Sequence, residues 1–174
     1  METLRGSIKS YAFEYIGQEE IKGNMGFKDA EFEDKMRAVG FRDTYAWCAL
    51  FCELVWTEAY KEFNPELLDT LESVFSAGTV RTYRRFKKLG WVGNIPQEGD
   101  IVIWQSYKRG KAQTTGHAAI VMEVGDGFIK TIEGNTNDKG GREGYTVAEK
   151  TRTIDFTNTN GLRMLGFIKP NNKI

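Results

Sequence analysis

The sequence predicts an α+β fold in which the helices come first and an antiparallel sheet follows. In roughly the first half, apolar residues recur at helical spacing, whereas the second half consists of short β-rich runs separated by Gly, Asn and Asp turns. No repeat, low-complexity tract or long linker divides the 174 residues. We therefore expect one domain over 1–174, with a helical part at about 1–90 and a β-sheet part at about 99–169.

Composition excludes several partner classes. The chain carries 24 Lys and Arg residues against 24 Asp and Glu residues, so its formal net charge is zero. No global field then favours nucleic acid, and we expect no nucleic-acid partner. No stretch approaches the roughly 20 apolar residues that span a bilayer, and residues 1–10 lack an apolar run behind a basic start. We expect synthesis in the cytoplasm without a signal peptide and no membrane span.

The helical part contains five predicted helices. Each is marked by apolar residues on one face and by a residue type that starts or stops a helix, such as Gly40, Gly90 or the pair Asn64-Pro65. In chain order, the helices are expected at about 4–16, 32–39, 47–63, 66–75 and 79–90, the last with Thr79 as its N-cap. The segment "GNMG" between the first two is expected to be a turn.

The β-sheet part contains five predicted strands. Each is rich in β-branched or aromatic residues and is bounded by turn residues. The runs, in chain order, are "DIVIW", "HAAIVMEV", "GFIKTIEGN", "YTVAEKTRTI" and "RMLGFIKP".

Two cysteines lie one helical turn apart in "YAWCALFCELVW". They cannot build the spaced disulfide framework of a small secreted scaffold, so both are expected to be reduced. Cys48 lies at the start of a predicted helix, where unpaired N–H groups and the helix dipole lower a thiol pKa. Cys52 lies one turn further in among apolar residues and is expected to be core. A cysteine on an apolar helix is more often structural than reactive, so the spacing alone leaves the role of Cys48 open.

The single histidine, His117, opens the predicted strand "HAAIVMEV" after a "TTG" turn. A histidine base needs a partner on its other ring nitrogen, and Glu133 and Asn135 lie two residues apart on one face of the next strand. Either could orient the imidazole. A zinc site is not expected, because one histidine and two cysteines supply at most three ligands and a structural site has four.

These motifs, in this order, resemble the CHAP family of cysteine- and histidine-dependent amidohydrolases and peptidases, which is grouped with the NlpC/P60 cell-wall hydrolases. The resemblance covers about residues 10–169 and rests on "AFEYIGQEEIKGN", "WCALF", "IPQEGDIVIW", "GHAAIVMEV" and "IEGN". It implies a papain-like (NlpC/P60-type) domain. Helices would pack on an antiparallel sheet of about five to six strands, with the nucleophilic cysteine at a helix N-terminus.

The resemblance also implies a site and a substrate. Cys48 would be the nucleophile, His117 the general base and acid, Glu133 the orienting residue and Asn135 a fourth polar member, with no cofactor. The substrate would be peptidoglycan, cleaved either as an N-acetylmuramoyl-L-alanine amidase or as an endopeptidase.

Three further expectations concern the surroundings of the nucleophile. Tyr45 is a candidate for the second oxyanion donor, and Trp47 for substrate contact, although packing is at least as good an explanation for Trp47. Several family members hold calcium through an Asp-rich loop, but "NTNDKG" places Lys139 where an oxygen ligand is needed. We therefore expect no essential metal.

The expected setting is lysis of a bacterial wall, as a phage lysin or a virion component. A virion or lysis-machinery partner would then deliver the protein, which we expect to be a monomer. Two alternatives stay open. One is a non-catalytic module that binds wall peptides on the same fold. The other is a papain-like transamidase, in which an amine resolves the thioester.

Overall fold

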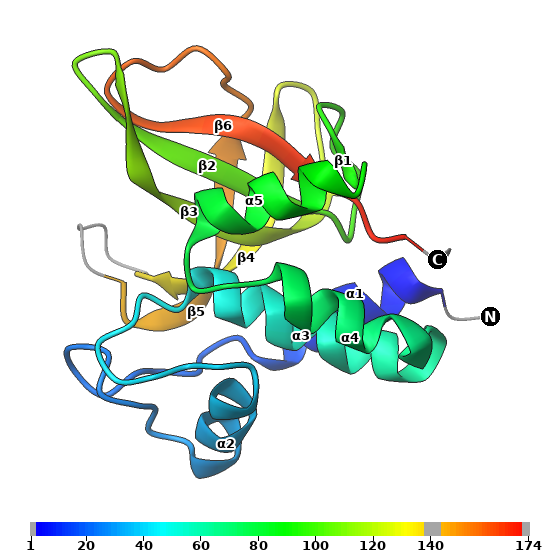
Figure 1. Ribbon diagram of the computed structural model, residues 1–174. Helices are drawn as coiled ribbons and strands as arrows, with labels where there is room; N and C mark the ends of the chain where they lie inside the picture. Colours follow the sequence, from blue (N-terminus) through cyan, green and yellow to red (C-terminus); the bar gives the residue numbers. More distant parts are fainter. Residues whose placement is uncertain (1–2, 138–143, 172–174) are drawn as a thin grey trace.

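The structure is a computed structural model that describes residues 3–137 and 144–171. The helices, in chain order, are α1 (Leu4–Glu14), α2 (Ala30–Ala38), α3 (Cys48–Phe63), a short 3-10 helix (Pro65–Leu67), α4 (Leu68–Val74) and α5 (Thr79–Lys88). The strands are β1 (Val92–Gly93), β2 (Ile101–Lys108), β3 (Lys111–Val124), β4 (Phe128–Thr136), β5 (Thr146–Thr153) and β6 (Gly161–Ile168). The predicted α+β class, with helices first and an antiparallel sheet second, is confirmed (Figure 1).

The helices pack on one side of the sheet. Strand order is β1-β6-β2-β3-β4-β5, and every paired neighbour is antiparallel. Helix α3 is the longest at 16 residues and is buried along most of its length because its sequence is apolar on nearly every face. Among the described helices, none has both the length and the apolar character needed to cross a membrane.

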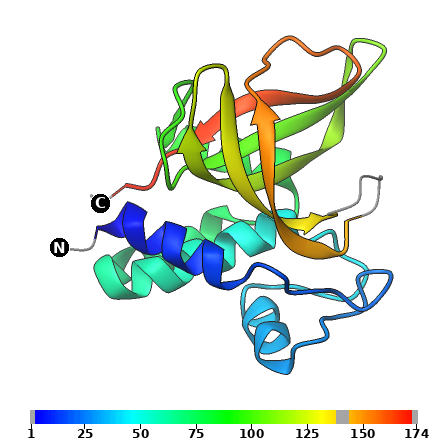
Figure 2. The ribbon, with the colours of Figure 1, turned by 180° about the vertical axis from the view of Figure 1, so that it is seen from behind.

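The sheet curls around a second, smaller core on its other side (Figure 2). Alternate residues of β2 and β3, such as Val102 and Ala119, point into this core, while their neighbours Ile103 and Ala118 face the helices. The Met164 N–H donates to the Asp155 carbonyl over 3.0 Å, which joins the segment after β5 to β6. The site described below lies at one end of this curled sheet.

Two predicted boundaries were wrong. Strand β3 begins at Lys111, so His117 lies in mid-strand and "TTG" is not a turn. The turn is instead Arg109-Gly110, where both residues have positive φ (52° and 73°) in a two-residue hairpin, the conformation that glycine favours. Thr79 is the first residue of α5, and Gly78 is the N-cap. Strand β1, only two residues long, had no pattern that could reveal it.

Candidate active site

Cys48 is the first residue of α3, as the sequence predicted. The preceding residue, Trp47, is fully buried and ends the loop that leads into the helix. Cys48 is 4 % exposed and is one of the residues that line a surface cleft. The first N–H groups of a helix have no partner within the helix and favour negative charge, so this position stabilises a thiolate.

His117 lies beside Cys48 on β3. Its cross-strand neighbour is Trp104 of β2, whose ring stacks on the imidazole at a centroid distance of 5.8 Å and an interplanar angle of 28°. The indole covers one face of the ring and restricts its rotation. The imidazole interacts with the Cys48 thiol closely enough to lower the pKa of the thiol. Because Nε2 faces Glu133, the nitrogen that serves Cys48 is Nδ1.

Glu133 of β4 holds the far side of the imidazole. Its Oε2 lies 2.8 Å from His117 Nε2, and the carboxylate has no solvent exposure. Arg152 of β5 donates to both carboxylate oxygens, from Nε to Oε1 over 2.7 Å and from a terminal nitrogen to Oε2 over 2.6 Å. Thr131 and Thr136 add hydroxyl donors at 2.8 and 3.3 Å. A buried carboxylate with so many donors is fixed in place and stays ionised.

The charges of the site favour a thiolate and an imidazolium. Burial alone would raise the pKa of the Cys48 thiol, but the charge and hydrogen bond of His117 outweigh it, and the pKa is below its usual value. Burial would likewise lower the pKa of His117, but Cys48 and Glu133 together hold it well above the usual value. Arg152 and His117 keep the pKa of Glu133 well below its usual range despite burial.

Asn135 occupies a different place from Glu133. Its φ of 52° falls at an irregularity of β4, so the simple alternation that would put both side chains on one face is broken. With its amide in the orientation its neighbours require, Nδ2 donates to the Gly144 carbonyl over 3.0 Å, and Oδ1 accepts the Trp47 N–H over 3.3 Å. Asn135 therefore lines the cleft and ties β4 to the start of α3, whereas Glu133 is hidden behind His117.

The expected roles of Tyr45 and Trp47 do not fit the structure. The Tyr45 N–H already donates to the Arg42 carbonyl over 3.0 Å, and Tyr45 is not among the described residues that line the cleft beside Cys48. Trp47 is fully buried against Phe27 and donates its indole N–H to Glu20 over 2.7 Å, so its side chain cannot contact substrate. Trp47 therefore packs behind the nucleophile and does not form part of a substrate-binding surface.

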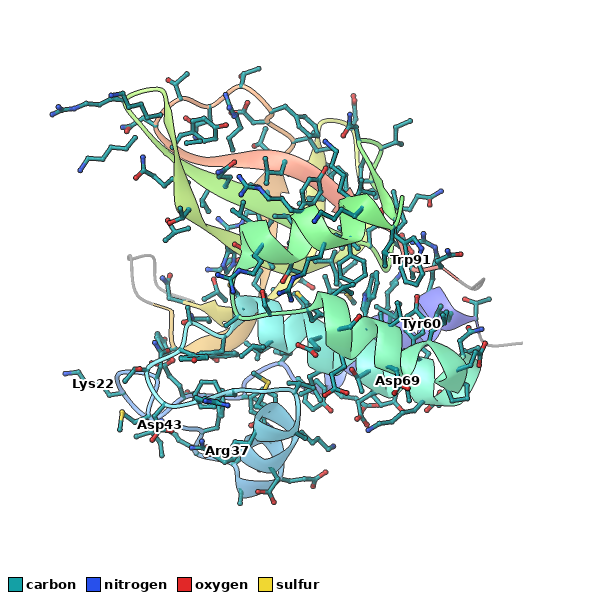
Figure 3. All side chains as sticks on the ribbon, in the orientation of Figure 1. Lys22, Arg37, Asp43, Tyr60, Asp69 and Trp91 are labelled. Atoms are coloured by element: carbon teal, nitrogen blue, oxygen red, sulfur yellow. The ribbon has the colours of Figure 1, made fainter. Side chains whose placement is uncertain are left out.

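A cleft runs past Cys48 and His117 in two arms that share Gly116, His117, Asn135 and Gly144. The sheet arm, about 990 Å³, lies at the open end of the curled sheet. The loop arm, about 780 Å³, lies against the segment before α2 and is lined by Cys48 and Lys22. Figure 3 shows Lys22, which lines the loop arm, on the opposite side of the molecule from Trp91.

Within residues 3–137 and 144–171, no group of three or more His, Cys, Asp or Glu side chains could hold a metal ion. The loop in which Lys139 argued against calcium lies outside the described residues. The expectation of no essential metal therefore stays a prediction.

Arg152 is the site residue that the sequence did not indicate. Its position in "YTVAEKTRTI" alternates with Lys150, as expected for one face of a strand. Nothing in that pattern says which acidic residue lies opposite. Its pairing with Glu133 depends on the register of β4 against β5, which places Arg152 opposite Ile129.

The thiolate at Cys48 predicts an unusual pH dependence of alkylation. An ordinary thiol loses about tenfold in reaction rate with iodoacetamide for each pH unit below its pKa. Cys48 has a lowered pKa, so its rate should fall by less than this tenfold between pH 7 and pH 6. Cys52 is completely buried and burial raises its pKa well above the usual value, so it should react slowly throughout.

Single-thiol variants separate the two signals. Cys52→Ala reports Cys48 alone, Cys48→Ala reports Cys52 alone, and intact mass gives the rate for each. A tenfold fall for the Cys52→Ala variant between pH 7 and pH 6 would contradict a preformed thiolate.

Comparison with known proteins gives one match. A family model described as "CHAP domain" matches residues 40–135, which is more than half of the chain and includes Cys48, His117, Glu133 and Asn135. Arg152 lies beyond the matched range. Searches of curated proteins and of solved structures found no match.

Proposed function

The chain belongs to the CHAP domain family, whose members are generally cysteine- and histidine-dependent amidohydrolases or peptidases, and on this premise we propose that it hydrolyses an amide bond of peptidoglycan. The expected papain-like α+β fold, with a cysteine at a helix N-terminus, is confirmed by the family match and the element order. The observation that carries the proposal is the continuous arrangement in which His117 lies between Cys48 and the buried carboxylate of Glu133.

In the first half of the proposed reaction, the Cys48 thiolate attacks the carbonyl carbon of the substrate amide. The tetrahedral oxyanion lies near the N–H of Cys48, which is the first N–H of α3 and has no partner within the helix. The C–N bond then breaks, and the imidazolium of His117 gives its Nδ1 proton to the departing amine. The products of this half are the free amine and a thioester on Cys48.

In the second half, neutral His117 takes a proton from water as the water oxygen attacks the thioester carbonyl. The C–S bond breaks, a carboxylic acid is released, and the thiolate and imidazolium are restored. Throughout, Glu133 accepts from the Nε2–H of His117 and keeps Nδ1 directed at the sulfur. Arg152 acts on this step only through Glu133 and is a positioning residue.

The finer features of this activity are also proposals. The reaction is that of either an N-acetylmuramoyl-L-alanine amidase or a peptidoglycan endopeptidase, because both reactions need the same groups. The setting is a phage lysin or virion-associated enzyme that meets the wall as a monomeric unit of one domain, and it rests on the sequence arguments above.

The test is digestion of purified peptidoglycan with the products read by mass spectrometry. We expect soluble fragments whose masses increase by one water per bond cleaved. Fragments with glycan separated from peptide would identify the amidase, and fragments that differ within the peptide would identify the endopeptidase. A mass that matches amine transfer instead of water addition would identify the transamidase and contradict the proposal.

A further inference from the structure

The two arms of the cleft differ in charge. The sheet arm is lined by Lys108, Lys150 and Arg152, and among its described lining residues there is no Asp or Glu. Its remaining polar lining consists mainly of amide and hydroxyl groups, such as those of Gln113, Asn135, Asn160, Ser106 and Thr115. We propose that this arm binds a carboxylate-bearing segment of the peptide whose amide bond Cys48 attacks. This inference rests on the proposed function.

The strand pattern of β5 directs its cations into the arm. Lys150 pairs with Thr131 and Arg152 pairs with Ile129, so both side chains stand on the inner face of the curled sheet. Glu149, which pairs with Ile132, stands on the opposite face. The acidic residue that precedes Lys150 is thereby kept out of the sheet arm.

The hairpin between β2 and β3 adds a second group of cations at the rim. Its turn reads "KRGK", which places Lys108 and Lys111 as a pair beside Arg109. The Gly110 N–H donates to the Thr159 carbonyl over 2.9 Å, which holds the tip of the hairpin against the segment before β6. Of these three cations, Lys108 lines the arm itself.

Most of this positive charge is not neutralised within the protein. Glu133 satisfies Arg152 through both carboxylate oxygens. Within residues 3–137 and 144–171, however, neither Lys108 nor Lys150 has a carboxylate partner. The loop arm is different because carboxylates line it: Glu19 and Glu20 lie there with Lys22 and Lys28, and Lys28 pairs with Glu19. A cleft lined by uncompensated charge of one sign attracts a ligand of the opposite sign.

The occupant is a peptide carboxylate and not the phosphate of an anionic wall polymer. The sheet arm shares His117 and Asn135 with the loop arm, which Cys48 lines, so whatever fills the sheet arm is continuous with the scissile amide. Its amide side chains can pair with peptide N–H and C=O groups, which a polyol phosphate lacks.

The test uses the Cys48→Ala variant and two synthetic muramoyl peptides that differ only in one free carboxylate against a carboxamide. Calorimetry should give a dissociation constant about fivefold to tenfold lower for the carboxylate form at low salt. The preference should shrink as salt is raised and disappear when Lys108→Glu and Lys150→Glu are added. Lys87→Glu with Lys88→Glu, the same total charge change at two exposed positions on α5, is the matched control and should keep the preference.

Equal binding of the two peptides, or a preference that survives both lysine changes, would overturn the inference. So would stronger binding of a soluble polyglycerol phosphate than of either peptide. Lys108→Gln with Lys150→Gln repeats the test if the double reversal does not fold. Because binding is measured without catalysis, the result is independent of whether the wild type hydrolyses peptidoglycan.

Discussion

Replacement of Cys48 by alanine is expected to abolish release of peptidoglycan fragments, with a loss on the order of 10⁴-fold or more. The reason is that the proposed reaction forms a thioester, and no other described thiol can reach the cleft. Cys48 lines the cleft beside His117, whereas Cys52 has no solvent exposure. The measurement is the initial rate of fragment release from the same wall preparation for each variant.

Cys52→Ala is the matched control, because it removes a sulfur one turn further along the same helix. It should keep activity within about threefold and lose about 1 kcal/mol of stability, since it leaves a small gap in a packed core. If Cys48→Ala released the same fragments as the wild type, the assignment of the nucleophile would be wrong. If the wild type released none from several wall types while still binding them, the non-catalytic binding module would be the better explanation.

Patterns in the sequence predicted the fold because they are local. The helical spacing in α3, the stop at Asn64-Pro65 and the turn residues between strands each act over a few residues, and their order gave the class. The start of β3 was missed because "KAQTTG" carries no apolar alternation. Its residues join the sheet through backbone pairing with the end of β2, and most of their side chains are exposed. The residue pattern of a single strand does not predict this kind of pairing, because the pairing depends on the neighbouring strand.

In the candidate site, too, local patterns predicted some features, whereas others depend on contacts between distant segments. The positions of Cys48 at a helix start and His117 on a strand followed from the sequence, and the family resemblance linked them to Glu133. The choice between Glu133 and Asn135 did not follow, because the irregularity in β4 that separates them depends on how Gly134 packs. A Cβ at Gly134 would lie 2.6 Å from Phe51 Cβ, so only glycine lets β4 approach α3 this closely. Gly134 can be read from the sequence, but the need for a glycine there becomes visible only from its contact with Phe51.

Replacement of Glu133 by glutamine is expected to lower kcat by about 100-fold or more and to shift the pH profile. Glu133 stabilises the imidazolium of His117, so its loss lowers the pKa of His117. Arg152, left without its carboxylate, lowers that pKa further. The thiolate–imidazolium pair exists only below the pKa of His117. The basic limb of kcat/KM should therefore move to lower pH, which a pH series of initial rates would measure.

Asn135→Ala is the comparison that separates an orienting residue from a cleft residue. Asn135 contacts Gly144 and the Trp47 N–H and not the imidazole, so its loss should leave the basic limb where it is and cost less in kcat. Thermal unfolding of both variants checks that each retains its fold. A larger fall in kcat for Asn135→Ala than for Glu133→Gln would overturn the assignment of Glu133. An unmoved basic limb in Glu133→Gln would show that the 2.8 Å contact to Nε2 does not set the charge of His117.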